Sequence, residues 1–181
     1  KGYGNSITLA KDIDTLEEAD HVLISLFLDM TESIHAYESP RQAAVLLKDR
    51  IRDHLGFTVN IGVAPNKLLA KMASDFEKPD KVHTLFPEEI PEKMWPLPVK
   101  DLFLVGKATQ KKLSLLGIRT IGELAQMDLK MLQAHVGNKH GQTLYNYARG
   151  IDLSPVDPEE GLNKGYGNSI TLAKDIDTLE E

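Results

Sequence analysis

The 181-residue sequence contains no cysteine and no long apolar run. The absence of cysteine excludes disulfides, thiolate catalysis and cysteine-ligated zinc, and it is typical of a reducing compartment. No stretch approaches the ~20 apolar residues that span a bilayer, and no basic start followed by an apolar block indicates a signal peptide. We therefore expect a cytoplasmic protein that has no membrane partner.

Metal ligands of other kinds are also sparse. The six histidines lack a spacing such as HxxxH on one helix face, so they predict no metal site. A formal net charge of −6 argues against a surface that binds nucleic acid throughout. Residues 100–120 are different, because they contain a single acid, Asp101, and several basic residues: Lys100, Lys107, Lys111, Lys112 and Arg119. The sequence thus predicts one local basic patch on an acidic chain.

An identical segment, KGYGNSITLAKDIDTLEE, occupies residues 1–18 and residues 164–181. Two copies are too few for a solenoid, whose units recur several times at a period of roughly 20 to 50 residues. Apolar and polar residues alternate over residues 7–10, which predicts a strand. The segment is therefore interpreted as genuine protein sequence present twice.

The first half of the chain alternates strand and helix signals. A helix is predicted at residues 39–56, with Ser39 as its N-cap and Gly56 at its end. A second helix begins near Asn66 and ends before Pro79. Strand-like composition occurs in three stretches, at residues 27–31, 57–64 and 81–86. The order strand, helix, strand, helix, strand predicts a partial α/β unit.

The second half of the chain predicts helices only. Four prolines in residues 87–98 mark a boundary that belongs to no helix or strand. Residues 99–150 lack strand-like alternation and predict four or five short helices, separated by Gly106, Gly117, Gly137 and Gly150. Residues 151–163 have the composition of a linker. The whole chain is therefore predicted to be α+β, with a partial α/β part followed by a small all-helical part.

The stretch LFLVGKATQKKLSLLGIRTIGELA, residues 102–125, gives the strongest indication of a binding site. It predicts a helix, a tight turn at Gly106 and a second helix. Such a turn exposes backbone N–H groups whose dipoles add to the helix macrodipole, which suits one phosphate, and nearby lysines add salt-dependent attraction. A helix-hairpin-helix module holds the DNA backbone in this way without reading bases. Spacing alone leaves open an ordinary hairpin whose glycines only turn the chain.

Three stretches occur in the order and at roughly the distances seen in one family: VNIGVAPNKLLAKMASDFEKPD, WPLPVKDLFLVGKATQKKLSLLGIRTIGELA and LYNYARGID. Together they resemble the Y-family translesion DNA polymerases, in the bacterial DNA polymerase IV and UV-damage-repair branch. The resemblance covers residues 27–181. It implies a role in DNA repair by damage bypass, as part of the SOS response.

The resemblance also implies a division of the chain. Residues 27–96 correspond to part of the palm and residues 97–150 to a helix-hairpin-helix thumb. Residues 151–163 are then a linker, and residues 164–181 are the start of the little finger. Residues 1–26 are a duplicated little-finger-like segment, so we interpret the chain as an excised or rearranged polymerase fragment.

Candidate binding residues follow from the same resemblance. Lys78, in FEKPD, matches the palm lysine that contacts the triphosphate of the incoming nucleotide, although by itself it is an ordinary exposed lysine. The thumb hairpin of the family usually carries two glycines, whereas here Gly106 is followed by Ala108, which predicts a less close approach to phosphate. The expected contacts to the primer–template backbone are Val105, Gly106, Lys107, Ala108, Thr109, Lys111 and Lys112.

The resemblance implies Mg²⁺ and dNTP in the parent enzyme, where carboxylates hold two metal ions. The sequence lacks the aspartate of the first palm strand, and LISL stands before Phe27 where the family has an Asp-Glu pair. Asp29 matches no metal-binding position, and Asp12 and Asp14 are expected to be solvated. We therefore expect no catalytic residue, no metal site and no bound cofactor in this fragment.

Two alternatives concern partners. A non-catalytic helix-hairpin-helix scaffold or protein-interaction module would use the basic hairpin to contact acidic groups of a protein. The front copy of the repeated segment is expected to supply a strand to an open palm edge, which also makes a strand-swapped homodimer possible.

Overall fold

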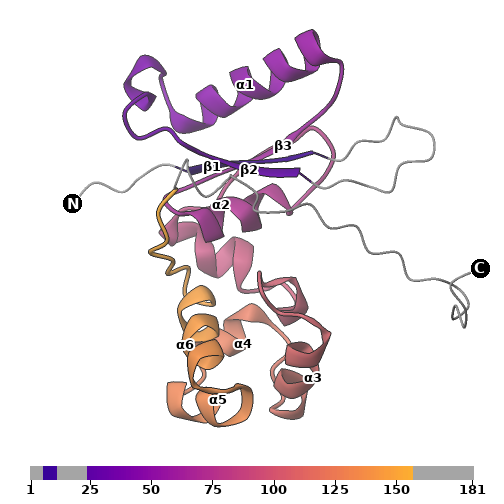
Figure 1. Ribbon diagram of the computed structural model, residues 1–181, viewed down its shortest axis with the longest axis vertical. Helices are drawn as coiled ribbons and strands as arrows, with labels where there is room; N and C mark the ends of the chain where they lie inside the picture. Colours follow the sequence, from indigo (N-terminus) through magenta and orange to yellow (C-terminus); the bar gives the residue numbers. More distant parts are fainter. Residues whose placement is uncertain (1–5, 12–23, 157–181) are drawn as a thin grey trace, which may run out of the picture.

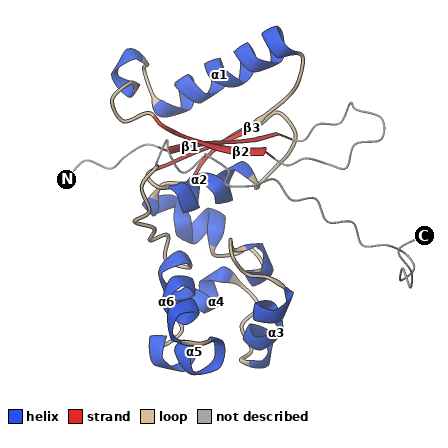
Figure 2. Ribbon diagram, viewed as in Figure 1, coloured by secondary structure: helices blue, strands red, loops and turns tan. Residues whose placement is uncertain are grey.

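The computed structural model describes residues 6–11 and 24–156 and has an α+β architecture (Figure 1). A small sheet lies between α1 (Pro40–Leu55) and α2 (Lys67–Ser74), and the helices of the second half lie beyond α2 (Figure 2). The predicted fold class is thus confirmed. The predicted little-finger start at residues 164–181 and most of the predicted linker lie outside the described residues.

The sheet contains four strands in the order β2-β1-β3-β4. They are β1 (Ser6–Lys11), β2 (Ile24–Asp29), β3 (Asn60–Ala64) and β4 (Val82–Thr84). β1 is antiparallel to both of its neighbours, whereas β3 and β4 are parallel. From β2 onward the predicted order of strand, helix, strand, helix, strand is confirmed. The strand from the front copy is present, but it lies inside the sheet between β2 and β3 rather than at its rim.

The side chains of β3 explain how helices cover both faces of the sheet. Ile61 and Val63 are buried with Ala44 of α1 in one apolar cluster. Gly62, between them, faces α2 and lies so close that a Cβ atom there would be 1.9 Å from the Ala70 carbonyl oxygen. Alternation of branched and small residues therefore lets two helices pack on one strand.

The ends of α1 and α2 are set by local hydrogen bonds. The Ser39 hydroxyl accepts the Gln42 N–H at 3.1 Å, and Gly56 adopts a left-handed conformation, φ 71°, after the last turn of α1. The Asn66 side chain accepts the Leu69 N–H at 2.9 Å and caps α2. The predicted starts of both helices are confirmed.

The second half consists of short helices. They are α3 (Lys107–Leu115), α4 (Ile121–Ala125), α5 (Leu129–Val136) and α6 (Asn138–Tyr147). The expectation of a helix before Gly106 is wrong, because only a 3-10 turn, Val99–Asp101, precedes the turn. The Val99 N–H donates to the Arg119 carbonyl at 2.8 Å. This hydrogen bond to a distant residue of the same chain replaces the hydrogen bonds of a longer helix.

The proline-rich residues 87–98 are also more ordered than expected. They form a 3-10 turn, Pro87–Glu89, and a π-helical turn, Ile90–Met94, so the expectation of no regular element is wrong. The physical reason is that apolar side chains between the prolines are buried in a core cluster that runs from α2 to α6. The Trp95 indole donates to the Ala148 carbonyl at 3.0 Å across the same region. The two halves therefore share one core.

Within the part of the chain that the structure describes, no helix is long and apolar enough to cross a membrane.

Candidate nucleic-acid interface

Gly106 is exposed at the N-cap of α3 with an ordinary φ of −79°. Nothing lies within 4 Å of the place where its Cβ atom would be. Every other glycine in the described residues has either a positive φ or an atom within about 3.0 Å of that place. Neither backbone conformation nor internal packing therefore requires glycine at this position. A group approaching from outside the molecule would benefit from the missing side chain.

The first turn of α3 exposes unpaired backbone donors. The helical ladder begins at Gln110, whose N–H donates to the Gly106 carbonyl at 2.9 Å. The N–H groups of Lys107, Ala108 and Thr109 precede that ladder, and no described side chain caps them. By contrast, side chains cap α1, α2, α4 and α5. The α3 N-terminus thus presents the donor set that binds an anion.

The lysines of α3 add positive charge to these donors. Lys107, Lys111 and Lys112 are all exposed, and the first two lie four residues apart on one face of the helix. Lys107 lies at the positive end of the helix dipole, where it is unfavourable for the isolated helix and favourable for a bound anion. Val105 differs from the other predicted contacts, because its side chain packs against the core cluster. The structure therefore places residues 106–109 at the N-terminus of α3, with Lys111 one turn further on, Lys112 in the last turn and Val105 turned inward.

A second helix N-terminus, which the sequence reasoning missed, lies beside the first. The Thr109 hydroxyl lies 3.1 Å from Nε2 of His140, and both residues belong to the first turns of their helices. α6 begins after Gly137, again with no side-chain cap. The available signal was a repeated Val-Gly pair, at residues 105–106 and 136–137, directly before the two helices.

Lys78 lies on a different element from the other predicted contacts. Its ammonium group is 3.2 Å from Asp75, and its side chain is 33% exposed. Asp75 also pairs with Lys71 at 3.0 Å. The same aspartate lines a cavity of about 400 Å³ together with Asp101, just before the helical half. Lys78 is therefore held near the junction of the two halves, in the loop after α2.

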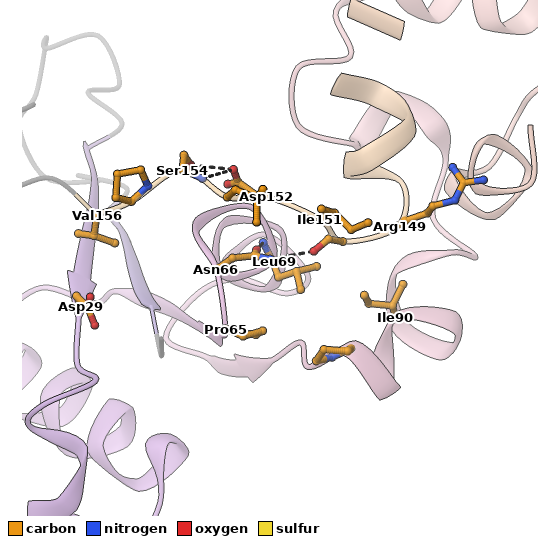
Figure 3. A pocket seen from close by; sticks show the side chains of 14 residues that line it. Asp29, Pro65, Asn66, Leu69, Ile90, Arg149, Ile151, Asp152, Ser154 and Val156 are labelled. Carbon is orange, nitrogen blue, oxygen red and sulfur yellow. Dashed lines mark hydrogen bonds between the residues drawn. The ribbon is translucent and has the colours of Figure 1, made fainter. Parts of the chain in front are cut away.

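A larger cavity of about 570 Å³ lies at that junction (Figure 3). The Asn66 amide donates to the Gly150 carbonyl at 2.9 Å across it. Asp152 accepts the Ser154 N–H at 3.0 Å and the Leu68 N–H at 3.2 Å. Asp152 therefore adds a second cap to α2 and fixes the chain that leaves α6.

The acids of this cavity do not fit a magnesium site. Asp29 accepts hydrogen bonds from the Thr31 hydroxyl and the Thr31 N–H, and these bonds hold the pKa of Asp29 below its usual value. Asp152 is occupied by backbone donors. Within residues 6–11 and 24–156, no group of three or more histidine or carboxylate side chains is placed to hold a metal ion. Mg²⁺ requires several oxygen ligands in octahedral geometry, which these two acids do not supply.

Comparison with known proteins agrees with this architecture. The family model described as "DNA polymerase-iota, thumb domain" matches residues 100–152, and the "impB/mucB/samB family" model matches residues 8–75. DNA polymerase IV of Clostridium acetobutylicum is 46% identical over 155 residues, which are 86% of this chain and 39% of that protein. DNA polymerase IV of Moorella thermoacetica is 44% identical over 156 residues, or 86% and 39% of the two chains.

These matches show a Y-family DNA polymerase fragment. DNA polymerase IV 1 of Bacillus subtilis adds a further relative, 42% identical over 156 residues, or 86% of this chain and 37% of that protein. The Y-family fragment spans about two fifths of the length of the curated relatives that it matches. The match to the thumb-domain model includes all of α3 to α6, so the uncapped N-terminus of α3 lies inside the matched region.

Proposed function

We propose that this Y-family fragment binds the sugar–phosphate backbone of primer–template DNA through the N-terminus of α3. The observation that carries the proposal is Gly106, an exposed glycine that neither a positive φ nor internal packing requires, followed by uncapped N–H groups. Backbone amides and a helix dipole at such a position bind phosphate independently of sequence. The role fits damage bypass by a translesion polymerase, in which the DNA must be held whatever its bases.

We extend the proposal to the complete enzyme, where Lys78 would contact the triphosphate of an incoming dNTP and Mg²⁺ would support phosphoryl transfer. The fragment itself is proposed to hold DNA without adding nucleotides. The acids at the junction cavity support this view, because Asp152 accepts hydrogen bonds with both oxygens and Asp29 accepts those of Thr31 with one.

A charge-reversal pair tests the DNA-binding proposal. The variant Lys111→Glu/Lys112→Glu is titrated into a fluorescently labelled primer–template duplex at increasing salt, with anisotropy as the signal. We expect roughly a tenfold or greater loss of affinity at ~0.1 M salt and a salt slope smaller by about two, because each phosphate contact releases one counterion.

Arg41→Glu/Arg50→Glu is the matched control, because it changes the net charge equally with exposed residues of α1. Figure 1 places α1 and α3 at opposite ends of the molecule. Equal losses in both variants would mean that only net charge matters and would contradict the proposed site. Binding that does not respond to salt would favour the protein-interaction alternative.

A primer-extension assay tests the catalytic half of the proposal. The fragment is incubated with primer–template DNA, the four dNTPs and Mg²⁺, and the primer length is followed on a gel. We expect no extension even at protein concentrations that saturate the DNA. Robust synthesis would contradict the proposal and would require acids outside the described residues to hold the metal.

A further inference from the structure

The sheet has one strand position that two segments of this chain match equally well. β1 pairs with β2 from Ser6–Asp29 to Lys11–Ile24 and with β3 from Ser6–Ala64 to Ala10–Asn60. We call its place between β2 and β3 the central strand position. The strand order β2-β1-β3-β4 puts β1 there. Because both neighbours bond to it, a strand in this position joins β2 to the rest of the described sheet.

The strand sequence SITLAK occurs a second time at Ser169–Lys174, inside the identical segment 164–181. A strand of identical sequence would offer the same donors, acceptors and side chains to β2 and β3. We propose that Ser169–Lys174 enters the central strand position of its own molecule in exchange with β1. The palm-like sheet is then a binding site for an extended segment, of the β-augmentation type, with two occupants encoded in one chain.

The position of the described chain end supports exchange within one molecule. Val156 and Asp29 line the same cavity, and Figure 3 shows both side chains near the β2 strand. Asp29 is the β2 residue opposite Ser6, where the strand in the central position begins. Val156, the last described residue, therefore lies near the end of the central strand position at which Ser169 would take the place of Ser6.

The two copies also have tethers of equal length. Residues 12–23 connect β1 to β2, and residues 157–168 separate Val156 from Ser169, which is twelve residues in each case. Twelve extended residues reach about 40 Å. Because the closure cost depends on the logarithm of tether length, neither copy gains a large entropic advantage. A tethered strand also has a high effective concentration relative to one from a second molecule.

A disulfide across β1 and β2 can report which copy is present. Ile61 and Val63 bond to β4, so Asn60 turns its backbone N–H and C=O toward its β1 partner, Ala10. Ala10 therefore forms a non-hydrogen-bonded pair with Ser25 of β2. The Cα atoms of such a pair approach to about 4.5 Å, which suits a disulfide.

The experiment uses the full chain, which has no cysteine of its own. Ser25→Cys/Ala173→Cys reports on the second copy, and Ser25→Cys/Ala10→Cys reports on the first. After mild oxidation, non-reducing peptide mapping by mass spectrometry is expected to find an intramolecular link in both variants, with yields within about tenfold of each other. Adding Thr8→Pro, which removes a backbone donor of the first copy, should increase the link between positions 25 and 173.

Thr8→Ala keeps the backbone donor and is expected to leave the ratio of the two links unchanged. The proposal fails if positions 25 and 173 form an intramolecular link neither in the otherwise natural chain nor in the Thr8→Pro variant. Links found only between two molecules would instead show a strand-swapped homodimer. Absence of the link between positions 25 and 10 would overturn the assumed register of the strand and with it the proposal.

Discussion

Two glycines show how the palm-like and thumb-like regions use the same residue differently. Gly62 lies in β3 against α2, and a Cβ atom there would collide with the backbone at Ala70 and Ser74. Gly106 begins α3 and has nothing within 4 Å of its missing Cβ. The first glycine is therefore required by packing inside the protein. The second is required neither by packing nor by a positive φ, and we propose that it leaves room for a phosphate outside the protein.

The helices that follow these glycines differ in the same way. The side chains of Asn66 and Asp152 accept the first N–H groups of α2, so its N-terminus stabilises the junction between the two halves. The first N–H groups of α3 have no described side-chain partner. An unsatisfied donor is tolerated where water or a ligand can reach it. The comparison shows that a helix N-terminus indicates a binding site only where its caps are missing.

The largest expected effect in this comparison is that of Gly62→Ala. The added Cβ atom would lie 1.9 Å from a backbone oxygen, which cannot move unless α2 moves. We expect a loss of about 3 kcal/mol or more in the free energy of unfolding. Gly106→Ala, the matched change, should alter it by less than about 0.5 kcal/mol. Urea unfolding followed by circular dichroism measures both, and equal losses would remove the distinction between the two glycines.

Asn66→Ala should have the next largest effect. It removes the cap on the Leu69 N–H and the hydrogen bond to the Gly150 carbonyl. We expect a loss of about 2 kcal/mol, measured by the same urea unfolding. Asn66→Asp keeps the acceptor for the cap but has no amide donor for Gly150, so its loss should be smaller. If the two variants were equally destabilised, the cap would contribute nothing.

Gly106→Asp tests the comparison by giving the N-terminus of α3 a side-chain cap. A carboxylate at the N-cap can accept the free N–H groups, so we expect stability to rise by a few tenths of a kcal/mol. The same carboxylate should repel phosphate and lower the affinity for primer–template DNA about tenfold or more. Urea unfolding and anisotropy on the same samples check the two effects. A gain in stability without a loss of affinity would separate the open helix end from DNA binding.

The smallest expected effect is a pH dependence of stability that arises in the sheet-containing half. Burial lowers the pKa of His83 from its usual value of 6.5, and its Nε2 atom has no hydrogen-bond partner in the structure. The unfolded chain therefore takes up a proton first, and stability declines as the pH falls from 6.5 toward the lowered pKa. Unfolding midpoints at pH 7.5 and 5.5 should differ more for the natural chain than for His83→Gln. Equal differences would show that His83 does not contribute.

Features that depend on near neighbours in sequence were predictable. Ser39 caps its helix as expected, the second helix begins next to Asn66 as predicted, and Thr120 forms a capping box of the same local kind with Glu123. These bonds span three residues, so a short sequence window contains both partners. The exposed position of Gly106 before a helix followed from the same kind of local pattern.

Features that depend on distant partners were not predictable from the sequence. The contact of Thr109 with His140 joins helices 31 residues apart. The burial of Ile90 between prolines depends on α2 and α6, and the inward turn of Val105 depends on the same core. The interior place of β1 depends on its pairing with both β2 and β3, which lie elsewhere in the sequence. In each case tertiary packing decides between local conformations that the sequence alone allows.

The most direct test of the proposed interface is a backbone amide NMR titration of the ¹⁵N-labelled chain with a primer–template duplex. The account predicts saturable shifts that are largest at the N–H groups of Lys107, Ala108 and Thr109, with the capped N–H groups of Leu68 and Leu69 unchanged. Shifts that spare the first turn of α3, or that are as large at α2 as at α3, would contradict it.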